Sequence, residues 1–453
     1  RECSDALGLP LDKVRVSAAM VGGGFGGKED MSVQHHAALL AQKTNRPVKV
    51  KLTRTESILV HPKRHAMEMD FTTACDENGY LTAMKAVIIS DTGAYASLGG
   101  PVLQRACTHA AGPYNYQNID ITGKAYYTNN PPSGAFRGFG VTQSCFATEC
   151  NLNKLAEIVG ISPFEIRRRN ALKPGDIMPN GQIADETTAI AEALESVRDI
   201  CEKNPKVGIA CALKNSGLGV GIPDTGRCLI TVRDGKAHVT SSAACIGQGM
   251  GTVQVQMICQ VTGLSPEKII YDTPDTKFSP NAGNTTASRQ TLFTGEAAVR
   301  AAKELKAAID ENGSLESLDG RKFYGEYTGI TDKMGSDKEN PVSHVAYGYA
   351  VHVAELNDDG TVKKITAVHD VGNPVNPKAL EGQIEGGVVM SMGYALTEYY
   401  PLDKGRPLAK MGTLGLLRAD KVPEIEPVVI GKKINGPALG AKGIGEIAAI
   451  PTA

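Results

Sequence analysis

Short apolar runs separated by glycine-rich loops recur along the whole chain. Alternating runs at 66–71 and 81–89 flank the turn Asp76-Glu-Asn-Gly79, which predicts two strands joined as a hairpin. Gly160 and the Ser162-Pro163-Phe164-Glu165 sequence predict the end of one helix and the start of the next. We expect helices over 31–43, 141–159, 187–202, 295–309 and 381–399.

A second series of apolar runs begins after Pro205. We expect strands over 207–213, 228–232, 237–241, 345–355 and 362–370, with a tight hairpin at Asp234-Gly235. Residues 310–342 are polar and rich in turn residues, which predicts a surface excursion. Strands and helices occur together in both halves, so the pattern predicts a mixed α/β (α+β) protein with two domains, 1–205 and 206–453.

The glycine-rich loop from Gly22 to Glu29 is the most unusual local feature. Five glycines surround Phe25, between an apolar run at 14–21 and the expected helix at 31–43. Each glycine loses much conformational entropy on folding, and an ordinary turn does not need five. Further glycine-bearing loops precede expected helices, at about 134–140, 247–251, 283–295 and 440–445. Several helix N-termini that converge on one large anionic cofactor would explain this arrangement.

Two nucleotide-binding templates fit the first loop formally. Gly22 to Lys28 has the spacing of a phosphate-binding loop, but Glu29 occupies the position of the hydroxyl that would meet magnesium. The same glycines satisfy a dinucleotide fingerprint, and Glu56, after a predicted strand at 48–52, is a possible ribose partner. The loop alone indicates close backbone contact with a cofactor and leaves the cofactor open.

Composition excludes several classes of function. The 453 residues are 42% hydrophobic and 21% charged, with a net charge of −1, so nothing indicates a nucleic-acid or anionic-membrane partner. No apolar run approaches the ~18 residues of a membrane span. The ten cysteines form no CxxC pair, which predicts buried thiols in a reducing cytoplasm rather than a zinc or iron–sulfur site. The start at Arg1 does not read as a signal peptide, and we expect a piece of a longer polypeptide.

Taken together, the motifs resemble the molybdenum cofactor-binding part of the xanthine dehydrogenase and aldehyde oxidase family. In order, they are Gly22-Gly-Gly-Phe-Gly-Gly-Lys-Glu29, Gly134-Ala-Phe-Arg-Gly-Phe-Gly140, Gly247-Gln-Gly249, Ala287-Ser288 and Lys442-Gly-Ile-Gly-Glu446. The resemblance covers essentially the whole chain and is closest to xanthine dehydrogenase. It implies two elongated mixed α/β domains with a molybdopterin, in bacteria often a cytosine dinucleotide, bound at their interface.

The resemblance also implies residue roles. The cofactor-contacting positions would be Gly24, Phe25, Gly26, Arg137, Gln248, Ala287, Ser288 and Gln383. The pterin dithiolene holds the molybdenum in this family, so no protein ligand to the metal is expected. Glu446 matches the catalytic base, which takes a proton from Mo–OH as its oxygen attacks an electrophilic carbon and hydride passes to Mo=S.

Substrate residues follow from the same resemblance. Glu29 and Arg105 match the pair that holds the polar edges of a purine, and Phe139 matches a ring-stacking aromatic, which favours xanthine or hypoxanthine. A second stacking phenylalanine expected near 221–226 is absent, so a nicotinate-like heterocycle or an aldehyde remains an alternative.

The resemblance implies electron-transfer partners as well. No iron–sulfur or flavin motif occurs here, so 2Fe–2S and FAD groups are expected on partner subunits or missing segments, in a dimer of heteromers. Two other classes stay open: a P-loop or nicotinamide enzyme, and a non-catalytic homologue that assembles or sorts cofactor.

Overall fold

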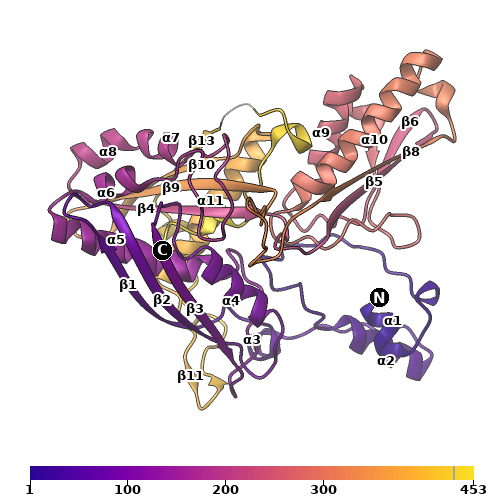
Figure 1. Cartoon of the computed structure of the whole chain (residues 1–453). Helices are drawn as coiled ribbons and strands as arrows, with labels where there is room; N and C mark the ends of the chain where they lie inside the picture. Colours follow the sequence, from indigo (N-terminus) through magenta and orange to yellow (C-terminus); the bar gives the residue numbers. More distant parts are fainter. Residues whose placement is uncertain (432–433) are drawn as a thin grey trace.

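The computed structural model describes residues 1–431 and 434–453, and its helices and strands form three main sheets with surrounding helices (Figure 1). A three-stranded and a four-stranded sheet lie together on one side of the molecule. The second four-stranded sheet, with two long helices, projects on the other side. None of the helices in the described part of the chain has the length and hydropathy of a transmembrane segment.

The first sheet has the order β1-β2-β3. β1 (Met67–Cys75) and β2 (Leu81–Asp91) are antiparallel, so the expected hairpin is confirmed. β3 (Asn118–Tyr126) runs parallel to β2 after a crossover through α4 (Gly99–Thr108), and neither β3 nor α4 was expected. α5 (Val141–Val159) has the predicted bounds and ends at Gly160 in the left-handed conformation. α6 (Pro163–Asn170) follows, and the Ser162 side chain accepts a hydrogen bond from Glu165 N as predicted.

The central sheet has the order β13-β10-β9-β4. Its strands are β4 (Val207–Ser216), β9 (Ala346–Leu356), β10 (Val362–Asp370) and β13 (Glu424–Ile430). α7 (Ile190–Glu195) and α8 (Arg198–Lys203) replace the single helix expected over 187–202. α11 (Pro377–Leu396) packs on β10 through Ile384, Val388 and Met392.

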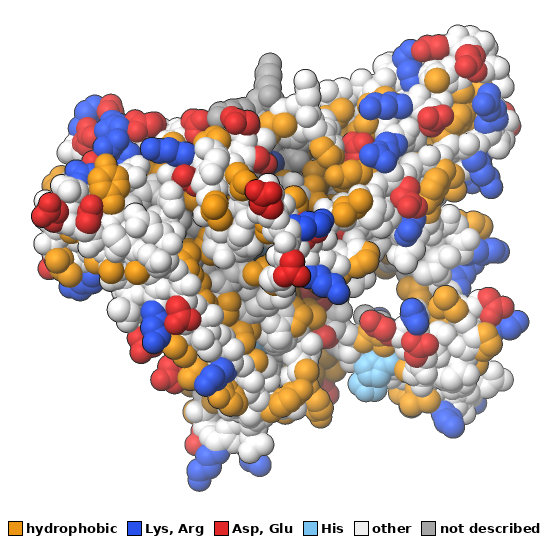
Figure 2. Space-filling model, viewed as in Figure 1, with side chains coloured by type: hydrophobic (Ala, Val, Ile, Leu, Met, Phe, Trp, Pro, Cys, Tyr) orange, Lys and Arg blue, Asp and Glu red, His pale blue; other side chains and the backbone are white. Residues whose placement is uncertain are grey.

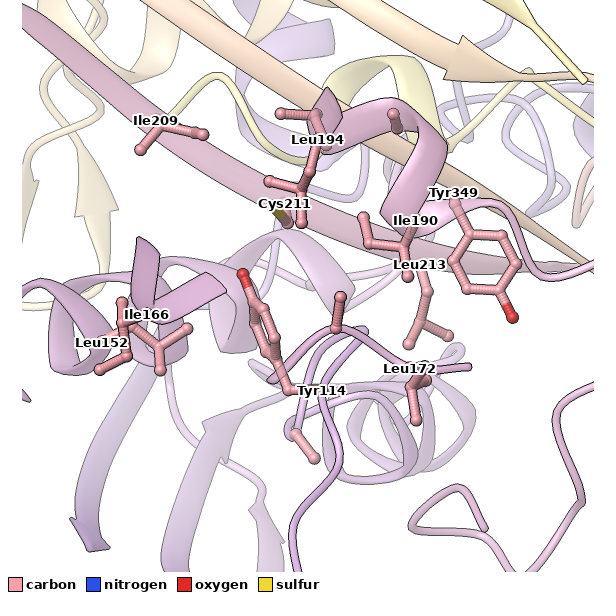
Figure 3. Packing of buried hydrophobic residues seen from close by; sticks show 14 of the residues in the cluster. Tyr114, Leu152, Ile166, Leu172, Ile190, Leu194, Ile209, Cys211, Leu213 and Tyr349 are labelled. Atoms are coloured by element: carbon pink, nitrogen blue, oxygen red, sulfur yellow. The ribbon is translucent and has the colours of Figure 1, made fainter. Parts of the chain in front are cut away.

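The largest hydrophobic core joins the first sheet to the central one (Figure 3). Leu152 of α5, Ile166 of α6 and Ile190 of α7 meet Cys211 and Leu213 of β4 in this core. The core therefore contains residues from both sides of position 205, where the sequence places a domain boundary. That boundary stays a prediction.

The third sheet has the order β7-β6-β5-β8 and is covered by α9 (Met250–Thr262) and α10 (Gln290–Asn312). Its strands are β5 (Asp224–Arg233), β6 (Lys236–Thr240), β7 (Ile269–Tyr271) and β8 (Lys322–Gly329). Asp234-Gly235 joins β5 to β6 as predicted. β8 corrects the expectation of a surface excursion over 310–342, because it pairs along β5 and buries Phe323 against α10.

The N-terminal segment corrects the expected strand–loop–helix layout. Within 14–21 only Ser17 makes a β-bridge, to Asp275, and 48–52 forms no strand. The helices here are α1 (Glu2–Leu7), α2 (Gln34–Thr44) and α3 (Arg54–Val60). α2 begins seven residues after the glycine loop and buries none of its residues, and α1 and α2 lie apart from the sheets (Figures 1 and 2). A strand needs a neighbouring edge for its backbone groups. The run at 14–21 pairs only with the short segment 274–276, where Ala18 N donates to Pro274 O and Thr276 N donates to Val16 O.

Candidate functional site

One cavity of about 520 Å³ collects residues from loops far apart in the sequence. Its volume is that of a typical cofactor or substrate pocket. It is lined by residues of six segments, 22–29, 135–139, 246–253, 285–291, 371–383 and 441–446. All the candidate site residues line it except Arg105: Gly24, Phe25, Gly26, Glu29, Arg137, Phe139, Gln248, Ala287, Ser288, Gln383 and Glu446.

Two glycine loops touch backbone to backbone at one wall of the cavity. A Cβ on Gly26 would lie 2.5 Å from the carbonyl oxygen of Ala135, and the φ of Gly26 is +99°. Arg137 N donates to the carbonyl oxygen of Phe25 at 2.9 Å. Only glycine combines that φ with so close an approach, so the first loop serves as a backbone wall. The lysine of this loop folds back onto it, because Lys28 Nζ donates to the carbonyl oxygen of Gly23 at 2.6 Å. Lys28 therefore does not extend away from the loop as the lysine of a phosphate-binding loop would.

Backbone strain gathers around the same cavity. Phe25, Phe139, Ala287 and Ser288 are non-glycine residues with φ between 47° and 54°. Non-glycine residues in this region cost about 1–3 kcal/mol each and persist where the surroundings hold them. Such strain is typical of ligand-binding and catalytic sites, and it coincides with four of the sequence-predicted positions.

Arg137 connects three of the lining segments. Its side chain is buried, Nη2 donates to Gln383 O of α11 at 2.9 Å, and Nε donates to Gly445 O. Burial lowers the pKa of Arg137 to about 10, and the Glu446 carboxylate opposes that effect. The guanidinium thus holds the Glu446 loop against α11.

Three helices present their N-terminal ends to the cavity. Met250 of α9, Gln290 of α10 and Ala379 of α11 lie in the first turns of their helices and line it. Gln248 closes the turn before α9, because its Oε1 accepts from Ile246 N at 2.7 Å. Helix N-termini carry partial positive charge and favour anionic ligands. The prediction of converging helix starts holds for the loops before α9 and α10, and α11 adds a helix start that the prediction did not include. Gly22–Gly27 precedes no helix directly, and Glu446 precedes only a three-residue turn, Ile447–Ala449.

A buried ion pair between Arg289 and Asp224 holds the Ala287–Ser288 loop in place. Arg289 Nε lies 2.5 Å from Asp224 Oδ1, and both side chains are at most 3% exposed. The same guanidinium donates to the carbonyl oxygens of Ala282 and Thr225. Arg289 therefore braces the loop backbone while Ala287 and Ser288 face the cavity.

Glu446 is a buried carboxylate with a cation and a hydroxyl at the same oxygen. Ser288 Oγ donates to its Oε2 at 3.1 Å, and Glu446 N donates back to Ser288 Oγ at 3.1 Å. Lys214 Nζ lies 3.4 Å from the same Oε2. The carboxylate is thereby oriented by two partners, which suits a group that must accept a proton at a defined point.

Glu29 faces the same cavity in a different environment. Burial raises the pKa of its carboxyl to about 7; a hydrogen bond from Thr286 acts against this shift, and the Glu446 charge adds to it. With a pKa of about 7, Glu29 is partly protonated near neutral pH, and in that form it can donate a hydrogen bond.

Arg105 is the candidate that the structure does not bring to the cavity wall. It lies in α4, 7% exposed, and its Nη2 donates to Leu218 O. Its Nη1 makes no hydrogen bond within the described part of the chain. Arg105 is near enough to Glu446 for that carboxylate to raise its pKa, although burial lowers it more strongly.

Sequence reasoning missed Lys214, and it named Lys442 in the last motif without giving it a role. Lys442 Nζ pairs with Asp370 Oδ2 at 2.5 Å and lines the cavity. For Lys214 a signal existed: the tripeptide Lys214-Asn-Ser216 directly continues an apolar strand and is buried throughout. Three polar residues that extend a buried strand indicate an internal polar site.

The chain is similar in sequence to molybdopterin-binding proteins. Molybdopterin cofactor-binding domain models match residues 1–171 and, as a second type, residues 184–319 and 310–423. A probable xanthine dehydrogenase subunit from Bacillus subtilis is 33% identical over 98% of this chain and 65% of its own length. The chain belongs to the xanthine dehydrogenase and aldehyde oxidoreductase family.

Within this molybdopterin-binding family the similarities extend to several enzymes. The large molybdopterin subunit of nicotinate dehydrogenase from Eubacterium barkeri is 45% identical over 44% of this chain and 47% of its own length. The structure of aldehyde oxidoreductase from Desulfovibrio gigas superposes with a TM-score of 0.90 at 28% identity, over 99% of this chain and 52% of that one. That superposition confirms the mixed α/β fold. The chain spans about half to two thirds of the length of these family members.

Proposed function

We propose that this chain forms the molybdopterin-binding, catalytic part of a hydroxylase that oxidises an N-heterocycle, with a purine such as xanthine or hypoxanthine as first candidate. The observation that supports this proposal most strongly is that Glu446 and Glu29 line one cavity, Glu446 beside the Lys214 ammonium group and Glu29 with a pKa raised by burial. Family membership supports the cofactor, and the paired carboxylates support proton transfer at a bound heterocycle.

The residues of the cavity fit a molybdopterin. The backbone of Gly24, Phe25 and Gly26 would form one wall, and Arg137 and Gln383 would close the side toward α11. Gln248, Ala287 and Ser288, beside the helix starts of α9 and α10, would face its anionic portion, for which we propose the cytosine dinucleotide form. Within the described residues no group of three or more His, Cys, Asp or Glu side chains is placed to hold a metal ion. When bound, the cofactor supplies a two-electron oxidant and the oxygen that hydroxylates an electron-poor carbon.

Glu446 accepts the proton that this reaction releases. Its Oε2 is fixed by Ser288 and Lys214, so the carboxylate stays in one orientation at the cavity wall. The protonated form of Glu29, which its pKa of about 7 keeps populated near neutral pH, donates a hydrogen bond to a ring nitrogen or carbonyl of the substrate. Phe139, which lines the cavity, stacks on the heterocycle.

A nicotinate-like substrate is the second candidate. A purine would use both Glu29 and Arg105, but Arg105 is tied to Leu218 O and does not line the cavity. The 45% identity with a nicotinate dehydrogenase subunit over 44% of the chain favours the same alternative. Aldehydes are a third option, supported by the superposition with aldehyde oxidoreductase.

Electron acceptors are expected on other polypeptides. We propose iron–sulfur and FAD subunits as partners, because related chains are named as subunits of larger enzymes. The complete complex is therefore the material to assay.

The decisive experiment compares wild type with Glu446→Gln in the intact complex, using hypoxanthine, xanthine, nicotinate and an aromatic aldehyde as substrates. We expect molybdenum and pterin in both proteins, heterocycle oxidation by wild type, and a loss of kcat of about 10²-fold or more in the variant. Purified complex without molybdenum, or equal turnover by the variant, contradicts the proposal. Bound cofactor without turnover by either protein would instead support a cofactor-sorting homologue.

A further inference from the structure

Lys214 lies at the end of β4, where its side chain is only 2% exposed. It shares a sheet face with Ala212, which packs against Ile447 next to Glu446. Across the sheet it pairs with Gly348, where a Cβ would lie 3.5 Å from Gly443 O and 3.9 Å from Ile447 Cδ1. The loop that carries Glu446 therefore rests on this end of the central sheet.

Among the described residues, one carboxylate acts on Lys214. Its Nζ lies 3.4 Å from Glu446 Oε2 and donates to Asn215 Oδ1 at 2.7 Å. The other titratable groups that act on it are cationic or titrate as bases: Arg105, His109 and His344. Burial lowers the pKa of Lys214 to about 8, and Glu446 opposes the shift. Without Glu446, the lysine would be a buried cation with no counter-ion.

The residues after Lys214 hold the two loops that flank the carboxylate. Ser216 Oγ accepts from Gly443 N at 2.9 Å, and Gly217 N donates to Ala287 O at 2.8 Å. The strand end 214–217 thus contacts both the Glu446 loop and the Ala287–Ser288 loop. It is rigid because β4 is hydrogen-bonded along its length to β9.

We propose that Lys214 is the positioning residue of the active site: its ammonium group orients the Glu446 carboxylate and keeps it ionised, ready to accept the substrate proton. This inference rests on the proposed role of Glu446. A buried carboxylate without a cation takes up a proton more readily, and an ammonium group within 4 Å reverses that tendency. A lysine that served only as a core ion pair would affect stability but not the pH at which Glu446 works.

The test uses the complete complex with Lys214→Met, Lys214→Gln and Lys214→Arg, each assayed for molybdenum and pterin content. We expect the neutral variants to keep cofactor, to lose kcat about tenfold or more, and to shift the acid limb of the kcat/KM profile upward by about one pH unit. Lys214→Arg keeps the positive charge, so the acid limb of its profile should stay in place. Loss of the Lys214 proton would give wild type an alkaline limb near pH 8, and this limb should move to higher pH in Lys214→Arg because arginine does not lose its proton there. An unchanged pH profile in the neutral variants overturns the proposal.

A second measurement does not depend on turnover. Thermal unfolding of Lys214→Met, Glu446→Gln and the double variant forms a double-mutant cycle. We expect the double variant to lose less melting temperature than the sum of the two single losses, because neither group is then buried without its partner. Additive losses overturn the proposal. If Lys214→Met does not fold alone, recovery of folding in the double variant supports coupling, and its absence contradicts it.

The cycle also separates the two proposals. Should the complex lack molybdenum or activity, the proposed function fails while the cycle still reports the Lys214–Glu446 coupling. If wild type is active but the losses of melting temperature in the cycle are additive, only the proposed role of Lys214 is contradicted. Lys364→Met is the matched control, because Lys364 of β10 pairs with Glu424 and Glu426 of β13, away from the cavity. This variant should leave the pH profile and the Lys214–Glu446 coupling unchanged.

Discussion

At the scale of single residues, this site depends on two carboxylates that differ in partners rather than in chemistry. Glu446 has a lysine and a serine hydroxyl at its oxygen, whereas Glu29 is half-buried with no cation among the causes that shift its pKa. The same side-chain type can therefore act as a proton acceptor at one wall and a hydrogen-bond donor at another.

The raised pKa of Glu29 predicts a pH-dependent stability. Its carboxyl binds a proton with a pKa of about 7 in the folded chain, against 4.5 as the ordinary value, so the folded state holds more protons between these limits. Stabilisation from this group is complete below about pH 4.5, and the free energy of unfolding should fall by up to roughly 3 kcal/mol as pH rises through 7. Denaturant unfolding from pH 5 to 8 measures this. Glu29→Gln should make the free energy of unfolding depend less on pH between 5 and 8. An unchanged pH dependence in the variant would contradict the raised pKa of Glu29.

At the scale of elements, loops and helix starts build the cavity while strands hold them. The first glycine loop meets the second through backbone alone, at Gly26 and Ala135. Arg137 and Arg289 then fix three of the loops to α11 and β5. Glycine at position 26 is therefore a structural requirement of the wall.

Gly26→Ala should break this wall. A Cβ would lie 2.5 Å from Ala135 O at a φ of +99°, so we expect a loss of about 1–3 kcal/mol in stability together with weakened cofactor retention. Gly22→Ala is the control, because a Cβ there meets nothing within 4 Å and its φ is not positive. Chemical unfolding and molybdenum content would measure both variants; equal behaviour of the two would show that the close approach does not matter.

At the scale of the whole molecule, the cavity lies where remote parts of the chain converge. Residues 22–29 and 135–139 come from the first half, and 246–253, 285–291, 371–383 and 441–446 from the second. A ligand that contacts all of them links the halves, as any ligand that binds only the folded state adds to its stability.

Removal of cofactor should therefore lower the melting temperature of the complex. The expected loss is several degrees, since a ligand at about 100 times its Kd contributes roughly 2.7 kcal/mol. Comparison of complex produced with and without molybdate measures it. An identical melting temperature, at equal subunit composition and with the difference in metal content verified, would argue against a cofactor that bridges the cavity walls.

Local patterns in the sequence determined much of this protein. The β1–β2 hairpin, α5 with its Gly160 end, the Ser162 cap and the β5–β6 turn all follow from short-range rules. The motif set also anticipated eleven residues that line the cavity. These features depend on backbone conformation and residue type within a few positions, which the sequence displays directly.

Other features were decided only by tertiary structure. The apolar run at 14–21 finds no neighbouring strand, while the polar stretch 310–342 supplies β8 because β5 offers an open edge. Arg105 is held at Leu218 away from the cavity, and Lys214 reaches Glu446 across 232 positions of sequence. Strand pairing and ion pairing depend on which groups meet in space, and no local pattern encodes that. The glycine loops could be found in the sequence, but the charges around Glu446 required the folded chain.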